Sequence, residues 1–276
     1  MRNVLLPALV VALLAPVNAD AQDWRNLSQS RARTGERALR VNVEYGAGLL
    51  ELRPAQDGIL YRTRMRYDAQ AFTPELKYAD GRLSIEIEGG QIRGRHMKGG
   101  NLDLALSTEV PLDLELQFGA AEARIDLGGM RLTKAAIKTG ASKTVVNISS
   151  PNPQVCSSLE IEVGAAQFEV NSLGNLHVER LRLSGGVGEV LLDFRGAWET
   201  NLRADIEMGL GSLTLRVPRG LGLRVQKQGI LSGFDSQGLV KRGEVYFSEN
   251  WERAERRLTI DLEAALGSIR VVWVDG

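Results

Sequence analysis

The sequence predicts an all-β chain that winds as a single-stranded β-solenoid with inserted hairpins, in about seven repeats of roughly 22 residues. The first observation is an alternation of apolar and polar residues that changes phase across a glycine. Because side chains alternate between the two faces of a strand, a repeated phase change indicates a bend that keeps one face inward. In the copy around Gly209 the apolar positions are Ala204, Ile206, Met208, Leu213, Leu215 and Val217.

The second observation is that this phase change recurs at regular spacing. From Gly119 to Gly209 the copies stand 21, 24, 22 and 23 residues apart, a period that fits two short strands and two corners. A β-sandwich does not require one identical corner in every repeat, so the spacing favours a solenoid. Leu116, Ile161, Leu183 and Ile206 are then expected to occupy equivalent inward places. The predicted structural corners are Gly46, Gly119, Gly140, Gly164, Gly186 and Gly209, with Ala265 in the last copy.

The first residues of the chain have the features of a secretory signal peptide, which we assign to 1–21. Arg2 supplies a positive charge, Val4–Leu14 an apolar core, and Ala19-Asp20-Ala21 a small-residue cleavage site. The apolar core is too short to cross a bilayer, and no later stretch approaches the roughly 18 apolar residues that a membrane helix needs. We therefore expect an exported protein, periplasmic or at the cell surface or extracellular, that does not span the membrane after cleavage.

The mature chain is divided into three parts in this interpretation. Residues 22–37 are polar and predict a flexible leader. Residues 38–130 form an N-terminal β region with inserted hairpins, including a turn at Asp80-Gly81, and residues 131–276 form a β-solenoid region continuous with it. A second insertion, 219–257, interrupts the later repeats. The inserted hairpins of the N-terminal region and this second insertion both stand where the exposed ends of a solenoid need caps.

Charge and cysteine content exclude several classes of protein. Cleavage removes Arg2 and Asp20, which leaves 33 basic and 33 acidic residues of the original 34 and 34. This balance argues against nucleic acid or an anionic membrane surface as a bulk electrostatic partner. Cys156 is the only cysteine, so an intrachain disulfide is impossible, and we expect a small core residue rather than a reactive thiol.

No motif in the sequence predicts catalysis, a cofactor or a metal. His96 and His177 are 81 residues apart and lack cysteine or paired carboxylate neighbours at ligand spacing. The Gly-x-Gly pairs lack a third glycine and a following helix, so they are corners rather than phosphate loops, and no Gly-x-Ser-x-Gly elbow occurs. Three pairs of carboxylates share outward positions, where solvated charges are expected: Asp113/Glu115, Glu160/Glu162 and Asp261/Glu263.

Two surfaces are candidates for contact with another molecule. Arg93, Arg95 and Lys98 stand in a basic, glycine-punctuated loop that fits anionic cell-wall or lipid groups, although a solvated hairpin tip is the preferred explanation. Tyr246, Phe247 and Trp251 form an aromatic segment. This segment fits a sugar or protein contact, or it packs over the end of the solenoid as a cap.

Several motifs carry a resemblance to known families. Residues 209–218 (GLGSLTLRVP), 246–251 (YFSENW) and 258–271 resemble the C-terminal domain of LiaF-type cell-envelope stress proteins. The preceding half, with Tyr78-Ala-Asp-Gly81, is similar to bacterial toast-rack and adhesin-type domains. The resemblance implies a β-solenoid of the envelope without known catalytic residues. A cleavable leader stands where LiaF-type proteins carry membrane helices, which favours a freely exported scaffold.

We therefore expect a non-enzymatic, exported cell-envelope β-solenoid that binds or scaffolds another envelope component, in the stress response or in adhesion. The expected partner is an envelope protein or a cell-wall component, with no nucleic acid and no cofactor. An alternative is a carbohydrate-active β-helix enzyme, which requires two carboxylates within about 5–10 Å of each other in a groove. A further alternative is a self-assembling adhesin, which requires an exposed, flat terminal coil.

Overall fold

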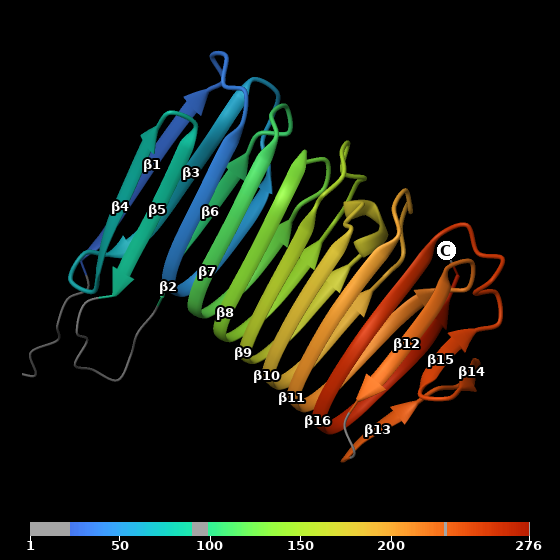
Figure 1. Cartoon of the computed structure of the whole chain (residues 1–276). Coiled ribbons are helices and arrows are strands. Elements are labelled where there is room, and N and C mark those ends of the chain that lie inside the picture. Colours follow the sequence, from blue (N-terminus) through green and yellow to red (C-terminus); the bar gives the residue numbers. More distant parts are fainter. Residues whose placement is uncertain (1–22, 90–98, 229–230, 276) are drawn as a thin grey trace, which may run out of the picture.

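A computed structural model describes residues 23–89, 99–228 and 231–275 of the chain (Figure 1). These residues form one 16-stranded sheet and contain no α-helix, which confirms the all-β prediction. A single 3-10 turn, η1, spans Leu173–Leu176. The strands are β1 (Trp24–Ala32), β2 (Leu39–Pro54), β3 (Ile59–Asp68), β4 (Phe72–Ala79), β5 (Arg82–Gly89), β6 (Gly100–Leu106), β7 (Leu112–Asp126), β8 (Leu132–Asn147), β9 (Ser158–Asn171), β10 (Arg180–Asp193), β11 (Leu202–Pro218), β12 (Gly222–Gln228), β13 (Leu231–Asp235), β14 (Leu239–Arg242), β15 (Val245–Ser248) and β16 (Arg257–Val274).

The long strands stack side by side in the order β2, β7, β8, β9, β10, β11, β16, and all of these neighbours pair in parallel. Each long strand turns back on itself, so its two arms lie in two layers that meet at the lower edge of Figure 1. The predicted inward residues Leu116, Ile161, Leu183 and Ile206 belong to one row of this register and are all buried, as the pattern predicts.

The bends coincide with interruptions of the ladder at the predicted corners. Between β10 and β11, Gly185 pairs with Met208 and Val187 pairs with Leu210. Gly186 and Gly209, which lie between these pairs, are skipped in the ladder. In β16 the equivalent place is taken by Ala265. A second set of glycines lies two positions later, where Gly188, Gly211 and Gly267 have φ of 146°, 144° and 129°. This second set has the left-handed backbone that side chains disfavour.

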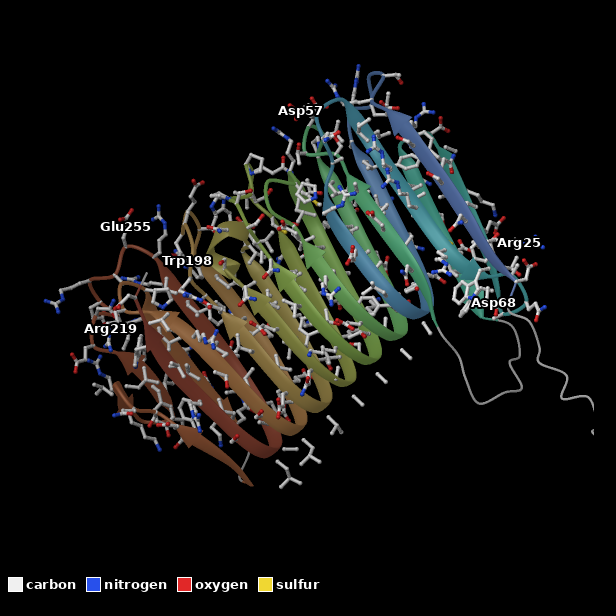
Figure 2. All side chains as sticks on the ribbon, turned by 180° about the vertical axis from the view of Figure 1, so that it is seen from behind. Arg25, Asp57, Asp68, Trp198, Arg219 and Glu255 are labelled. Carbon is white, nitrogen blue, oxygen red and sulfur yellow. The ribbon has the colours of Figure 1, made fainter. Side chains whose placement is uncertain are left out.

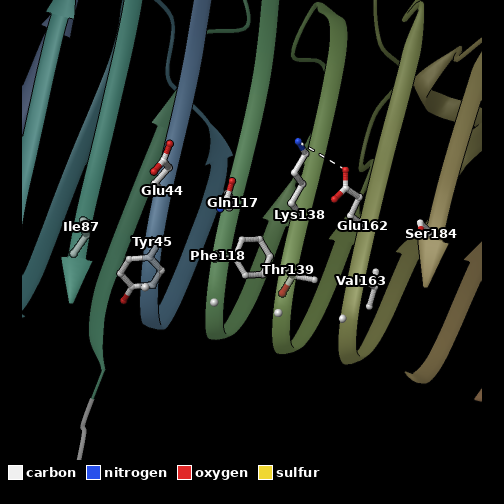
Figure 3. A pocket seen from close by; sticks show the side chains of 14 residues that line it. Glu44, Tyr45, Ile87, Gln117, Phe118, Lys138, Thr139, Glu162, Val163 and Ser184 are labelled. Carbon is white, nitrogen blue, oxygen red and sulfur yellow. Dashed lines mark ion pairs between the residues drawn. The ribbon is translucent and has the colours of Figure 1, made fainter. Parts of the chain in front are cut away.

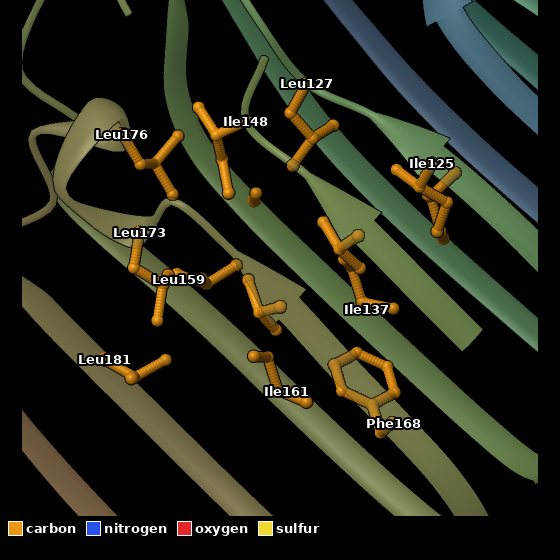
Figure 4. Packing of buried hydrophobic residues seen from close by; sticks show 14 of the residues in the cluster. Ile125, Leu127, Ile137, Ile148, Leu159, Ile161, Phe168, Leu173, Leu176 and Leu181 are labelled. Carbon is orange, nitrogen blue, oxygen red and sulfur yellow. The ribbon is translucent and has the colours of Figure 1, made fainter. Parts of the chain in front are cut away.

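The core lies between the two layers. Inward side chains of both arms interdigitate along the whole stack, and Figure 4 shows this for the middle strands. Burial alternates before and after each bend, because the phase change returns the same face to the interior on the second arm. The sheet runs without a break through β7 and β8, which lie on either side of residues 130 and 131.

The N-terminal end of the stack differs from the sequence interpretation. Residues 22–37 were expected to be a flexible leader, but Trp24–Ala32 forms β1 and pairs antiparallel with β3. The pairing gives partners to the backbone N–H and C=O groups on the outer edge of β3. Two side-chain contacts hold β1 in place as well. Leu27 packs against the core, and the guanidinium of Arg66 lies 4.7 Å from the Trp24 ring centre. β4 and β5 form the predicted hairpin, whose turn places Asp80 and Gly81 at positive φ.

The C-terminal end is closed by the second insertion. β12, β15 and β14 extend the first-arm layer beyond β16, and β13 pairs with the second arm of β16. Phe234 of β13 meets Tyr246 of β15 edge to face, with ring centres 4.9 Å apart. This contact joins the two layers over the end of the core. In the described part of the chain, no helix has the length and apolar character needed to cross a membrane.

Candidate binding surfaces

The structural corners line one edge of the molecule and are places of close backbone approach. A Cβ atom at Gly119, Gly164 or Gly186 would lie 2.5, 2.9 or 2.8 Å from the carbonyl oxygen of the corner glycine in the preceding strand. These distances explain why the sequence repeats glycine there. The same spacing places Gly46, Gly140 and Gly209 in one row with them.

A groove of about 1000 Å³ crosses the first arms of β2, β7, β8 and β9 just before their bends (Figure 3). Its floor contains the corner glycines. At its N-terminal end the Tyr45 hydroxyl donates a hydrogen bond of 2.5 Å to the Gly100 carbonyl, and burial raises the pKa of this hydroxyl. The rim is a row of outward side chains, one per strand: Glu44, Gln117, Lys138, Glu162 and Ser184.

Lys138 is the central charge of this groove. Its ammonium lies 3.4 Å from a carboxylate oxygen of Glu115 and 3.8 Å from one of Glu162, and the hydrogen bond that it donates to Glu115 is the main cause of a raised Lys138 pKa. A glycosidase places the sugar between its two carboxyl groups. Here the space between Glu115 and Glu162 is filled by the lysine side chain.

Two of the remaining carboxylates, Asp113 and Asp261, join ordinary surface ion pairs. Asp113 lies 3.2 Å from Arg40, and Asp261 lies 2.8 Å from Arg203 and 3.5 Å from Arg224. Within the described residues, no group of three or more His, Cys, Asp and Glu side chains is arranged to hold a metal. His177 is buried beside Glu199, with 3.7 Å between Nδ1 and the nearest carboxylate oxygen, and His96 lies outside the described residues.

The basic loop of the sequence analysis, with Arg93, Arg95 and Lys98, also lies outside the described residues. Close to the point where the chain emerges from this loop, the structure reveals a different basic feature. Arg62, Arg64 and Arg66 occupy alternate positions of β3, so all three face outward on the second-arm layer. Figure 2 views this layer, and nitrogen-bearing side chains lie over its blue strands.

The neighbours of this arginine row are small and polar. Arg62 lies opposite Ser30 of β1, Arg64 opposite Ser28, and Arg66 opposite Asn26. On the β6 side the only charged neighbour among the described residues is Asp103, which lies opposite Arg64 but makes its 3.2 Å ion pair with Arg53. Sequence reasoning missed the row, although the alternation of arginine with apolar residues in 61–67 is a visible signal of it.

The aromatic segment splits into two parts. Tyr246 faces the interior and closes the end of the core through Phe234, which supports the cap interpretation for this residue. Phe247 and Trp251 lie on the outer side, with ring centres 5.8 Å apart. Arginine guanidinium groups cover both rings, Arg242 at 5.5 Å from Phe247 and Arg257 at 5.3 Å from Trp251. Each ring therefore already has a cation contact within the chain.

Cys156 is a buried thiol. Its Sγ lies 3.4 Å from the carbonyl oxygen of Ser158, and burial raises the pKa of the thiol to about 12. A thiolate is the reactive form of cysteine, so this side chain is chemically quiet at neutral pH.

Comparison with known proteins agrees with this architecture. The model of the N-terminal domain of toast_rack, DUF2154, matches residues 19–155 and 150–216, which is more than half of the chain. The chain belongs to the toast-rack family. The family match ends inside β11, so the last part of this toast-rack protein, from β12 to β16, lies beyond it.

Solved structures with similarity to this toast-rack protein include a candidate cell adhesion protein from Clostridium sporogenes. It is 18% identical, with a TM-score of 0.49, over 91% of this chain and 100% of that one. A candidate adhesin from Bacteroides fragilis is 12% identical, with a TM-score of 0.35, over 90% of this chain and 97% of that one. No curated protein matches this chain.

Proposed function

We propose that this toast-rack protein is a non-enzymatic binding scaffold of the cell envelope that holds an anionic, phosphate-bearing cell-wall polymer on its outer face. The observation that carries the proposal is the row of Arg62, Arg64 and Arg66 on β3. The ligand follows the row along the strand. Adhesion to, or organisation of, the envelope is the expected consequence.

Several other arginines of the same end are paired with carboxylates. Arg53 is paired with Asp103, Arg33 with Glu109, and Arg124 with Glu122 and Glu51 at 2.6 and 3.4 Å. Among the described residues, Arg62, Arg64 and Arg66 have no carboxylate partner. Arginines without a carboxylate partner are available to an external anion, and Arg66 keeps its contact with the Trp24 ring.

The spacing of the row supports a polymer rather than a single ion. Alternate residues of a strand are about 6.8 Å apart, so the three guanidinium groups follow a line of roughly 14 Å. Guanidinium forks bind phosphate through paired hydrogen bonds. The serine and asparagine neighbours on β1 add hydrogen-bond donors without adding negative charge.

Several finer features belong to the same proposal. Residues 1–21 are a cleaved signal peptide, so the protein works in the periplasm or at the cell surface. The stack of bent strands is a β-solenoid of about seven repeats, and the part beyond the family match is a LiaF-like C-terminal region that links the scaffold to envelope stress. The carbohydrate-active alternative is disfavoured because Lys138 fills the space between Glu115 and Glu162.

The test compares two matched double variants of the purified protein. R62T/R64T removes two cations from the row, and R180T/R182T removes two exposed arginines from the first-arm layer of β10. We expect R62T/R64T to weaken binding to a polyphosphate chain about tenfold, and R180T/R182T to change it little. The slope of log affinity against log salt falls by roughly 1.4 in the first variant alone.

Equal losses in the two variants would mean that binding depends on bulk charge and would contradict the proposal. Binding of neutral dextran at the same affinity as polyphosphate would contradict it as well. The finer claim of export is tested separately, by mass spectrometry of the mature protein, which is expected to begin after Ala21.

A further inference from the structure

The edge formed by the bends has two unlike halves. The residue that follows each corner points outward at the turn, and neighbouring copies stand in register along the edge. In the N-terminal half this residue is alanine, and in the C-terminal half it is a large aliphatic residue. The row reads Ala47, Ala120, Ala141, Ala165, Val187, Leu210 and Leu266.

The aliphatic half is raised and exposed. Val187, Leu210 and Leu266 are 52%, 49% and 48% exposed, and they are three of the few large apolar side chains that the described residues leave at the surface. Figure 2 shows side chains drawn in carbon alone projecting from the bends along the lower edge. Contiguous exposed apolar side chains on a soluble protein commonly mark a contact with another molecule.

The alanine half is hollow. The groove of about 1000 Å³ opens beside this half on the first-arm face, and the corner glycines that precede Ala47, Ala120, Ala141 and Ala165 belong to its lining. Its floor lacks side chains at the glycines, and the alanine row beside it adds only methyl groups. One edge of one chain therefore carries both a raised apolar half, with three large aliphatic side chains, and a hollow half, with four alanines.

We propose that two copies of this chain associate edge to edge through their bends, antiparallel, about a two-fold axis. The aliphatic half of each copy then lies over the hollow half of the other. Val187 meets Ala165 of the second copy, Leu210 meets Ala141, and Leu266 meets Ala120. In this two-fold arrangement both halves of both copies are occupied, and no half remains for a third copy. The arrangement therefore forms a dimer and not a filament.

The charges beside the edge fit this arrangement. In the antiparallel register Lys138 lies across from Glu207 of the second copy, Glu162 across from Ser184, and Gln117 across from Glu263. No like charges meet at these three steps. A parallel arrangement instead sets Lys138 against Lys143 of the second copy and leaves both hollows unfilled.

Other routes to self-association are less favourable. The terminal strand of the first-arm layer, β14, has four residues, and β4 at the opposite end carries Pro74. Short edges and proline both discourage end-to-end strand pairing. The bend edge is narrow, and it is about 29 Å long, which is six strand-to-strand steps of 4.8 Å. We therefore expect a weak dimer with a dissociation constant in the micromolar range or above.

Sedimentation equilibrium of the purified protein over a wide concentration range tests the proposal. We expect a monomer–dimer equilibrium without higher species. L210D places a charge at the centre of the raised half and is expected to raise the dissociation constant at least about tenfold. The matched control is V240D, because Val240 is 45% exposed but lies on β14, away from the edge.

A charge exchange keeps the test independent of folding. K138E and E207K each weaken the dimer, and K138E/E207K restores it. Lys138 and Glu207 lie three strands apart in one chain, so only a contact between copies explains the rescue. A monomer at every concentration, a dimer indifferent to L210D, or a double variant no better than the single ones would overturn the proposal. Polyphosphate binding, which uses β3, is expected to persist in L210D and therefore separates this outcome from failure of the proposed function.

Discussion

A Cβ atom added at Gly209 would lie 2.5 Å from the carbonyl oxygen of Gly186, its neighbour in the adjacent strand. Cβ atoms in proteins do not approach a carbonyl oxygen so closely, so a side chain at Gly209 would force these two bends to shift apart. The same relationship repeats at Gly119 against Gly46 and at Gly186 against Gly164. The bent stack thus depends on backbone approach at its corners as well as on its apolar core.

Gly209→Val is expected to destabilise the protein by about 2–3 kcal/mol, because the added side chain must push neighbouring strands apart. Thermal unfolding followed by circular dichroism should show a melting temperature lower by roughly 4–10 °C. Gly209→Ala is expected to cost less, since Ala265 already occupies the equivalent place in β16. Gly220→Val is the control, because a Cβ atom there meets nothing within 4 Å. Equal melting temperatures for G209V and G220V would refute the steric explanation.

Asn152→Ala is expected to cost about 3 kcal/mol, because it leaves buried peptide groups without partners. The Asn152 side chain accepts a hydrogen bond from the Leu132 amide at 2.9 Å and donates to the carbonyls of Leu132 and Leu176 at 2.9 and 3.3 Å. Urea unfolding measures the loss. Asn147→Ala, at an exposed position, should change stability by less than about 0.5 kcal/mol. Similar costs for both variants would show that the buried amide is unimportant.

Glu36→Gln is expected to destabilise the protein at neutral pH but not in acid. The carboxylate accepts hydrogen bonds from the Thr34 amide at 2.7 Å, from Arg31 and from the Tyr78 hydroxyl, and these bonds, the Thr34 one first, lower the pKa of Glu36 to about 2. A lowered folded-state pKa means that the stabilisation is present above the unfolded value of 4.5 and is lost as pH falls towards 2.

Urea unfolding at pH 7 and at pH 3 checks this sign. The difference between the wild type and E36Q should shrink on going to pH 3. Glu255→Gln is the control, since the Glu255 side chain is 86% exposed and pairs only with its neighbour Arg256 within the described residues. A difference for E36Q that is constant with pH would contradict the assignment.

The rate at which the Cys156 thiol is labelled is expected to measure how often the stack of strands opens. Burial raises the pKa of its thiol to about 12, so a thiol reagent at pH 8 should react only when the surrounding strands separate. The rate of reaction with a disulfide reagent in native buffer should therefore be far below that in 6 M urea, and it should rise in G209V. Rapid labelling of the native protein would show that the site opens without unfolding.

The alternation around each corner was sufficient to predict the strands, the bends and the inward residues, because period-2 burial depends on local sequence alone. The row from Leu116 to Ile206 follows from it directly. The existence of β1 could not be predicted from this alternation, because Trp24–Ala32 is polar and becomes a strand only through pairing with β3. The burial of Asn152 did not follow from the alternation either, because its amide serves peptide groups of adjacent turns.

The surfaces depended on neighbours that lie far apart in sequence. Whether Arg62 and Arg64 are paired is decided by strands β1 and β6. The raised and hollow halves of the bend edge emerge only when Ala141 and Leu210 are placed in one row. The spacing of residues along a single strand predicts neither the pairing of these arginines nor the order of residues along the bend edge.

The central claim is that equivalent positions of successive turns stand in one parallel, in-register row, on which the bend edge depends. Electron–electron distance measurements between spin labels test it most directly, with one label at Asn42 and the other at Arg182, Asp205 or Gln226. These pairs are four, five and seven strands apart in the register. The account predicts distances of about 19, 24 and 34 Å, at roughly 4.8 Å per strand. Distances that do not rise in this order would contradict it.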